Sequence, residues 1–282
     1  MRPVLVVGAG TMGSGIAQVF AAAGHPVYLR DQDAASLERG LASIAKNLDR
    51  LVKKGTLDAA AKSQVLERIR AAAPGSLADC AIAVEAVPER ADLKKAVLKE
   101  LDQALPKDAI LATNTSSISI TELAATTSRP SRVIGMHFMN PVPVMQLVEV
   151  VRGLDTSEET VNATMEAARL LGKTPVLVED RPGFVSNRVL LPMINEAVFA
   201  LQEGVATREA IDTVMKLGMN HPLGPLALAD LIGLDVCLDI LEVLHRGFGD
   251  DKYRPCPLLR QMVAAGRLGR KAGRGFYEYS GS

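Results

Sequence analysis

The stretch Val4-Leu-Val-Val-Gly8-Ala-Gly10-Thr-Met-Gly13 decides the fold of the N-terminal half of this chain. It joins a β-branched apolar run to glycines spaced G-x-G-x-x-G, and a small-residue segment that predicts a helix over 12–23 follows. Strand, glycine turn and helix in this order are typical of a dinucleotide-binding unit, with the pyrophosphate at the helix N-terminus. We expect Gly8 to make the tight turn, Gly10 to admit the pyrophosphate and Gly13 to allow close packing.

The second expected strand, 27–30, ends at Asp31, where an acidic side chain can bind both ribose hydroxyls and repel a 2′-phosphate. This position favours NAD(H) over NADP(H). Arg30 weakens that inference, because an arginine beside the ribose can accommodate the extra phosphate. An FAD-binding or vestigial form of the same unit stays open.

The rest of the chain divides into an alternating part and a helical part. Further strands are expected at 81–85, 109–113 and 174–178, and helices at 33–54, 57–72 and 92–104. Capping boxes at Ser119-x-x-Glu122 and Thr156-x-x-Glu159 predict two more helix starts, the second helix ending at Gly172. This alternation predicts a doubly wound, mostly parallel sheet with helices on both faces.

After residue 182 the strand signal disappears. Helical stripes are expected at 184–203, 207–217, 225–244 and 257–265, with a break at Gly233 left open. We therefore predict two domains, an α/β Rossmann-like domain over 1–182 and an all-α domain over 183–282.

Composition excludes several classes of function. Lys plus Arg and Asp plus Glu both total 32, so no overall field favours nucleic acid or an anionic membrane. The uncharged stretch 4–24 mimics a membrane span, but its glycines indicate a buried strand, turn and helix. Cys80, Cys237 and Cys256 are too widely spaced for a metal site or a disulfide framework, so we expect a cytoplasmic protein without metal.

A histidine and a carboxylate flank an expected hairpin. His137 ends an apolar run, Pro141 and Pro143 force a turn, and 144–151 reads as a returning strand that carries Glu149. An antiparallel pair of this kind can bring Glu149 beside His137, where the carboxylate would fix the tautomer and raise the basicity of the imidazole. The alternative is that His137 only caps a strand and Glu149 is solvated.

A hydroxyl-rich loop, Thr113-Asn114-Thr-Ser116-Ser-Ile-Ser119, follows the strand expected at 109–113. The carboxyl ends of parallel strands are where such sheets bind ligands, although an ordinary polar loop has the same composition.

Six ordered motifs together resemble the L-3-hydroxyacyl-CoA dehydrogenases from end to end, and within them the bacterial short-chain branch, the 3-hydroxybutyryl-CoA dehydrogenases. They are Gly8-x-Gly-x-x-Gly13, Asn114-Thr-Ser-Ser117, His137-Phe-x-Asn-Pro141, Glu149, Pro182-Gly-Phe-x-x-Asn-Arg188 and Gly273-x-Gly-Phe-Tyr277. The resemblance implies NAD-dependent interconversion of (S)-3-hydroxybutyryl-CoA and acetoacetyl-CoA. It also implies a homodimer formed through the helical domain.

The resemblance assigns roles residue by residue. His137 is the general acid/base, Glu149 orients it, and Ser116 and Asn187 hydrogen-bond the oxygens of the substrate. A helix-start cap is the plain alternative for Asn187. Expected cofactor contacts, beyond the three motif glycines and Asp31, are Thr11, Met12, Glu89, Lys94, Asn114, Ser116, Asn140 and Lys271.

The substrate contacts implied by the resemblance add Ser119 and two basic residues, Arg50 and Lys54. Lys46, Arg50, Lys53 and Lys54 recur at helical spacing and could meet the phosphates of coenzyme A, but a solvated basic face is nearly as good an interpretation. Three alternatives stay open for function: a longer or dicarboxylic substrate such as 3-hydroxyadipyl-CoA, a dehydrogenase of free 3-hydroxy acids, and a non-catalytic crystallin-like relative. The physiological direction is also open.

Overall fold

The computed structural model describes residues 1–73 and 77–279 and divides into two compact units, Met1–Arg181 and Pro182–Ser282. The first unit contains an eight-stranded sheet in the order β3-β2-β1-β4-β5-β6-β7-β8. Its strands are β1 (Val4–Val7), β2 (Val27–Arg30), β3 (Ile69–Ala71), β4 (Ile82–Glu85), β5 (Ile110–Thr113), β6 (Val133–Phe138), β7 (Leu147–Arg152) and β8 (Thr174–Glu179). The first six strands of this sheet order, from β3 at the edge to β6, are parallel to their neighbours. Strand β7 returns antiparallel to β6, and β8 runs parallel to β7.

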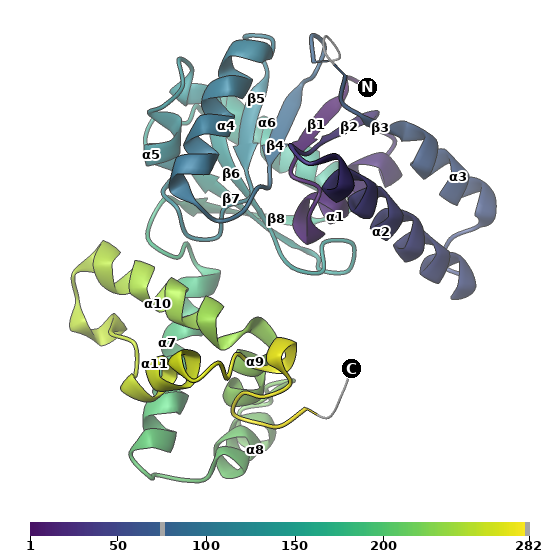
Figure 1. Ribbon diagram of the computed structural model, residues 1–282. Coiled ribbons are helices and arrows are strands. Elements are labelled where there is room, and N and C mark those ends of the chain that lie inside the picture. The colour runs from purple at the N-terminus through teal and green to yellow at the C-terminus, as the bar shows by residue number, and fades with distance from the viewer. Residues whose placement is uncertain (74–76, 280–282) are drawn as a thin grey trace. The chain divides into compact units, whose positions relative to one another are not determined.

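Helices cover both faces of this sheet, as predicted (Figure 1). They are α1 (Thr11–Ala22), α2 (Ala34–Lys53), α3 (Ala59–Arg68), α4 (Ala91–Ala104), α5 (Ile120–Ala124) and α6 (Glu158–Leu170), with a short 3₁₀ turn at Pro130–Arg132. On one face, apolar side chains of α1, α2 and α6 form a continuous core with alternate residues of the strands. On the other face α4 packs on β4 and β5, and α5 packs on β6. The central parallel strands β1, β4 and β5 are wholly buried, as expected where helices cover both faces of the sheet.

Two local predictions are wrong. The helix expected over 57–72 ends at Arg68, and Ile69–Ala71 instead forms β3, because the β-branched Ile69 pairs with Val27 at the sheet edge. The cap of α6 is Ser157, whose hydroxyl accepts from the backbone N–H of Thr160 at 3.2 Å, and not Thr156. The hydroxyl of Thr156 is already used, since it donates to the carbonyl oxygen of Val133 at 2.7 Å.

The second unit is helical around its own apolar core. It contains α7 (Ser186–Gln202), α8 (Arg208–Gly218), α9 (Pro225–Ile232), α10 (Leu234–Phe248) and α11 (Pro257–Ala264), with 3₁₀ turns at Asp251–Tyr253 and Arg270–Ala272. The helical stretch expected over 225–244 is interrupted at Gly233, where φ is +106° and the chain can leave one helix and begin the next. Buried Asp230 fixes the C-terminal segment by accepting from the backbone N–H groups of Phe276 and Tyr277.

The helices of the described residues offer no candidate membrane span, since none combines the necessary length with sufficient apolar character.

Candidate active site

The glycine turn between β1 and α1 has the geometry that its sequence predicts. Gly8 has a φ of +102°, and a Cβ there would meet the carbonyl oxygen of Ala86 at 2.5 Å. A Cβ on Gly13 would overlap the carbonyl oxygen of Gly8, so only glycine lets the helix approach the turn so closely. A Cβ on Gly10, by contrast, would meet no atom within 4 Å, which leaves the space beside this backbone to a ligand.

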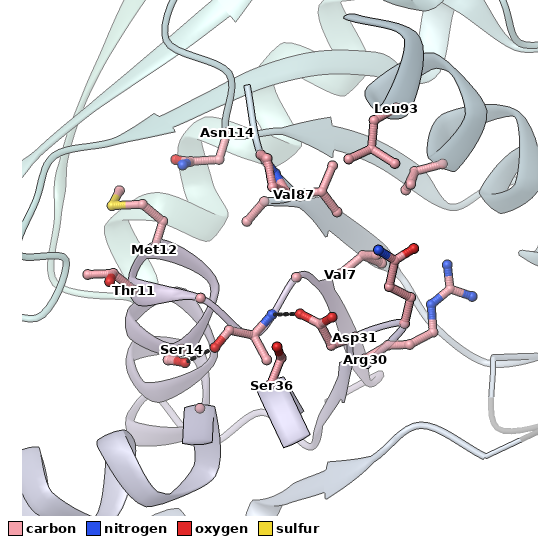
Figure 2. Close-up of a pocket in the computed structure, with 18 of the residues that line it drawn as sticks. Val7, Thr11, Met12, Ser14, Arg30, Asp31, Ser36, Val87, Leu93 and Asn114 are labelled. Atoms are coloured by element: carbon pink, nitrogen blue, oxygen red, sulfur yellow. Dashed lines mark hydrogen bonds between the residues drawn. The ribbon is translucent and has the colours of Figure 1, made fainter. Parts of the chain in front are cut away.

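A cavity of about 1090 Å³ opens beside this turn, within the first unit (Figure 2). The first turn of α1 faces it without an acidic residue and without a side-chain cap at Gly10, so its N–H groups can bind an anion. Pockets for drug-sized ligands occupy roughly 300–1,000 Å³, so the volume suits a larger ligand such as a dinucleotide. The predicted cofactor contacts that line it are Gly8, Gly10, Thr11, Met12, Asp31, Glu89, Lys94, Asn114 and Ser116.

The end of β2 carries two oppositely charged side chains into this cavity (Figure 2). Asp31 accepts from the backbone N–H of Ala9 at 2.8 Å, so its carboxylate holds the glycine turn in place. A carboxylate has further acceptor capacity for the hydroxyls of a ribose. Arg30 reaches away to α4, where its guanidinium binds Glu100 at 2.6 and 3.1 Å. The turn is also held by Ser14, whose hydroxyl donates to the carbonyl oxygen of Ala9 at 2.8 Å.

A buried charge network follows β4. Lys94 is 1% exposed, and its ammonium binds both carboxylate oxygens of Glu85, at 2.9 and 3.1 Å, and the carbonyl oxygen of Val87 at 3.1 Å. Glu85 is itself fully buried and accepts from the hydroxyl of Thr113 at 2.6 Å. The ammonium also lies 3.3 Å from Glu89. Lys94 is therefore a buried, paired cation, so a plain solvated lysine is excluded, and its contact with the cofactor stays a prediction.

Glu89 organises the loop that carries Ser116. Its Oε1 accepts from the hydroxyl of Thr115 at 2.6 Å and from the backbone N–H groups of Ser116 and Ser117 at 2.9 and 3.1 Å. Burial by itself would raise the pKa of Glu89. The ammonium of Lys94 and the hydrogen bonds from Thr115 and Ser116 outweigh it and lower the pKa below its ordinary value of 4.5. The carboxylate thus stays charged and holds the loop.

His137 and Glu149 face each other across β6 and β7 in the antiparallel register. Their side chains meet, with His137 Nδ1 2.8 Å from Glu149 Oε2, and both residues are buried. Because a carboxylate can only accept, Nδ1 carries the proton and Nε2 is the nitrogen able to exchange one. The predicted pair is therefore present, and the alternative of a solvated Glu149 is wrong.

The histidine is linked to the cavity through the strand ends. The amide oxygen of Asn114, which lines the cavity, accepts from the backbone N–H of Phe138 at 2.9 Å. Phe138 directly follows His137, so the backbone at the end of β6 that carries the histidine is tied to a residue of the cavity wall. Asn140, an exposed residue, begins the turn with a cis peptide bond to Pro141. Lys173 anchors that turn by donating to the carbonyl oxygen of Val142 at 2.6 Å.

The expected substrate contacts Ser119, Arg50 and Lys54 lie at helix ends of the first unit. Ser119 is the cap of α5, since its hydroxyl accepts from the backbone N–H of Glu122 at 3.2 Å, and it donates to Asp180 at 2.7 Å. Arg50 lies in the last turn of α2 and Lys54 is its C-terminal cap, both exposed. Lys46 and Lys53 are exposed on the same helix.

The remaining two candidates belong to the second unit. Asn187 lies in the first turn of α7, whose cap is Val185, so the plain alternative of a capping asparagine is wrong. Lys271 forms an ion pair with Asp235 at 2.6 Å within the same unit. Their contacts with substrate and cofactor stay predictions.

Sequence reasoning missed several residues of this site. Glu85 was given no role beyond ending an expected strand, although a charged residue closing a wholly apolar parallel strand is a usable signal, and Thr113 was seen only as part of a polar loop. Gly40 of α2 packs against the glycine turn, where a Cβ would meet the carbonyl oxygen of Ala9 at 2.6 Å. Glu100 gave no signal at all, since nothing in the sequence pairs it with Arg30.

Comparison with known proteins agrees with this geometry. Residues 3–181 match the family described as 3-hydroxyacyl-CoA dehydrogenase, NAD binding domain, and residues 183–279 match its C-terminal domain. The chain belongs to the 3-hydroxyacyl-CoA dehydrogenase family. Its first unit corresponds to the NAD-binding domain of that family, which the glycine turn and the cavity fit.

Alignments with named relatives extend over almost the whole of this chain. It is 58% identical over 280 residues to the probable 3-hydroxybutyryl-CoA dehydrogenase of Bacillus subtilis (strain 168), covering 99% of this chain and 98% of that one. It is 53% identical over 283 residues to the 3-hydroxybutyryl-CoA dehydrogenase of Bradyrhizobium diazoefficiens, covering 100% and 97%. Among solved structures, (S)-3-hydroxybutyryl-CoA dehydrogenase PaaH1 from Ralstonia eutropha matches with a TM-score of 0.97 and 54% identity over 100% of both chains.

Proposed function

We propose that this protein interconverts (S)-3-hydroxybutyryl-CoA and acetoacetyl-CoA with NAD(H) as the redox cofactor. The observation that carries the proposal is the buried pair of His137 and Glu149, with Nδ1 and Oε2 2.8 Å apart. The strand that carries His137 is tied at its end to Asn114, a residue of the cavity wall. Oxidation of a secondary alcohol needs a base for the hydroxyl proton at this place, and reduction of the ketone needs an acid.

The chain's own residues manage the proton. NAD(H), when bound in the cavity, would supply the acceptor and the donor for the hydride at C3 of the substrate. Nε2 of His137 takes the hydroxyl proton during oxidation and donates it to the forming alkoxide during reduction. Glu149 stays ionised, keeps the proton on Nδ1 and stabilises the imidazolium that forms.

Ser116 and Asn187 complete the proposed assignment by hydrogen-bonding the C3 oxygen and the thioester carbonyl of the substrate. The position of the Ser116 loop, fixed by Glu89, supports the assignment of Ser116. The exposed cations Arg50 and Lys54 at the end of α2 are the proposed partners of the coenzyme A phosphates. Ser119, Asn140 and Lys271 keep their predicted roles as ligand contacts.

A homodimer through the helical domain belongs to the same proposal. The second unit exposes large apolar side chains, among them Val189 at 67% and Leu217 at 82%, which favour burial against a partner. Light scattering of the purified protein tests this, and a monomer at every concentration contradicts it. A cytoplasmic location stays the prediction from the three free thiols, all of which are buried.

The proposed reaction is tested by the initial rate of acetoacetyl-CoA reduction, followed by the loss of NADH absorbance. Fast turnover supports the proposal, and free acetoacetate at the same concentration is the control for a dehydrogenase of free acids. Turnover of longer or dicarboxylic 3-ketoacyl-CoA without acetoacetyl-CoA turnover contradicts the short-chain assignment. Absence of turnover with every acyl-CoA, while NADH still binds, favours the non-catalytic relative.

A further inference from the structure

Arg30 and Glu100 form a two-point ion pair at the wall of the cofactor cavity. The two guanidinium nitrogens lie 2.6 and 3.1 Å from the two carboxylate oxygens. Both residues line the cavity, Glu100 from α4 and Arg30 from the end of β2, where Figure 2 shows it beside Asp31. A two-point arginine–carboxylate pair has fixed geometry and is stronger than an ordinary surface pair.

The second arginine of this part of the cavity is also paired. Arg39 of α2 lies 3.5 Å from Asp33, and its guanidinium donates to the hydroxyl of Ser36 at 2.7 Å. Asp33 in turn caps α2, which keeps its carboxylate in place. Arg90, the third arginine of the cavity lining, lies 2.8 Å from Asp92, so each guanidinium of the lining already has a carboxylate partner.

We propose that Glu100 is a residue that determines cofactor specificity, because it holds the guanidinium of Arg30 and so denies a 2′-phosphate its cation. The inference rests on the proposed function, since it requires NAD(H) to occupy this cavity. With Glu100 present, a doubly charged phosphate beside Asp31 meets the carboxylate of Asp31 and an Arg30 guanidinium that is already paired. With Glu100 neutral, Arg30 is released and can bind the phosphate through its fork.

A substitution of Asp31 would test the preference for NAD(H) less cleanly than a substitution of Glu100. The Oδ2 of Asp31 accepts from the backbone N–H of Ala9 at 2.8 Å, so a substitution there also disturbs the glycine turn. Arg30 directly precedes Asp31 and would offset its charge if it were unpaired. Glu100, which lies on a different element, α4, pairs with Arg30 and so prevents it from offsetting the charge of Asp31. The side chain of Glu100 is 56% exposed, so replacing it should leave the fold intact.

The experiment measures binding by calorimetry and so does not depend on turnover. Wild type, Glu100→Gln, Arg30→Met and the double variant are titrated with NADH and NADPH, and with the fragments ADP and 2′,5′-ADP, which differ in the 2′-phosphate. Glu159→Gln is the matched control, because Glu159 pairs with Arg132 at 3.2 Å and Arg132 is 27% exposed against 25% for Arg30.

Glu100→Gln is expected to tighten NADPH and 2′,5′-ADP about tenfold relative to NADH and ADP, as removal of one nearby charge allows. The gain should disappear in the double variant, which lacks the arginine, and should be absent in Glu159→Gln. The inference is overturned if Glu100→Gln leaves the ratio of NADPH to NADH affinity unchanged, or if the same gain occurs without Arg30. In either case, NADH binding by these proteins leaves the proposed cofactor standing. If the wild type binds neither NADH nor ADP, the proposed function itself is overturned.

Discussion

Replacing Lys94 by Met tests whether the buried network behind the cofactor cavity is structural. The substitution keeps most of the side-chain length and volume, so it removes the ammonium without opening a large cavity. What is lost is the contact of that ammonium with Glu85, at 2.9 and 3.1 Å, and with the carbonyl oxygen of Val87 at 3.1 Å. Glu85, fully buried, then has no cationic partner in the network.

The expected cost follows from this burial. Removing one member of a buried ion pair typically costs about 3–5 kcal/mol, because the remaining charge is left without compensation. The side chains of Lys94 and Glu85 are 1% and 0% exposed, which places the pair in that class. Lys95, the next residue of α4, provides the matched control. Its pair with Glu122 is exposed, with side chains 34% and 55% accessible, so Lys95→Met should cost only about 0.2–1 kcal/mol.

The assay is urea unfolding of the full chain by circular dichroism, together with calorimetric titration of NADH. Lys94→Met should be strongly destabilised, and Glu85→Gln/Lys94→Met should be more stable than the sum of the single losses, with a coupling above roughly 1 kcal/mol. A loss no larger than that of Lys95→Met would refute the structural role. Weaker NADH binding with unchanged stability would instead assign Lys94 to the cofactor.

Three further predictions concern the catalytic pair, the glycine turn and acid stability. His137→Asn should lower kcat by roughly 10²- to 10⁴-fold with NADH affinity nearly unchanged. The control His245→Asn, at an exposed pair with Asp251, should leave kcat unchanged. Loss of NADH binding in His137→Asn would mean that the role assigned to this histidine is wrong. Gly13→Ala should abolish NADH binding or folding, because its Cβ overlaps the turn; a variant that binds normally would contradict the close approach. The pKa of Glu89 and of Asp102 is lowered in the folded state, against the effect of burial, by charged and hydrogen-bonding neighbours. Their stabilisation is complete above the unfolded pKa and is lost as the pH falls through the lower folded values, so the Tm should fall below about pH 4. A Tm that does not change as the pH falls below about 4 would contradict this prediction.

The fold of the N-terminal unit could be predicted from sequence because its signals are local. The β-branched strand, the glycines at 8, 10 and 13 and the alternation of strand and helix each act over a few residues. The predictions that were wrong involve partners distant in sequence. Ile69 becomes a strand only because Val27 is beside it, and Thr156 gives up the cap of α6 only because Val133 binds its hydroxyl.

The same distinction applies to the candidate site. His137 and Glu149 could be paired from sequence, because a hairpin joins them and sets the register. The burial of Lys94 depends on packing of α4 against the sheet, and the pairing of Arg30 with Glu100 joins residues 70 positions apart. No periodicity encodes such contacts. A lysine or glutamate on a helix therefore looks solvated in the sequence whatever it binds in the fold.

The topology explains why these polar groups gather at one edge. Strands β4, β5 and β6 run parallel, so their carboxyl ends meet, and each end carries a polar group: Glu85, Thr113 and His137. Glu85 and Thr113 are register partners and share a hydrogen bond of 2.6 Å, which fixes β5 and the loop after it relative to β4. Burial of these groups is tolerated because each has a partner, Lys94 for Glu85 and Glu149 for His137. The same pairing holds each side chain in one orientation, so removal of one partner should be more damaging here than at an exposed ion pair.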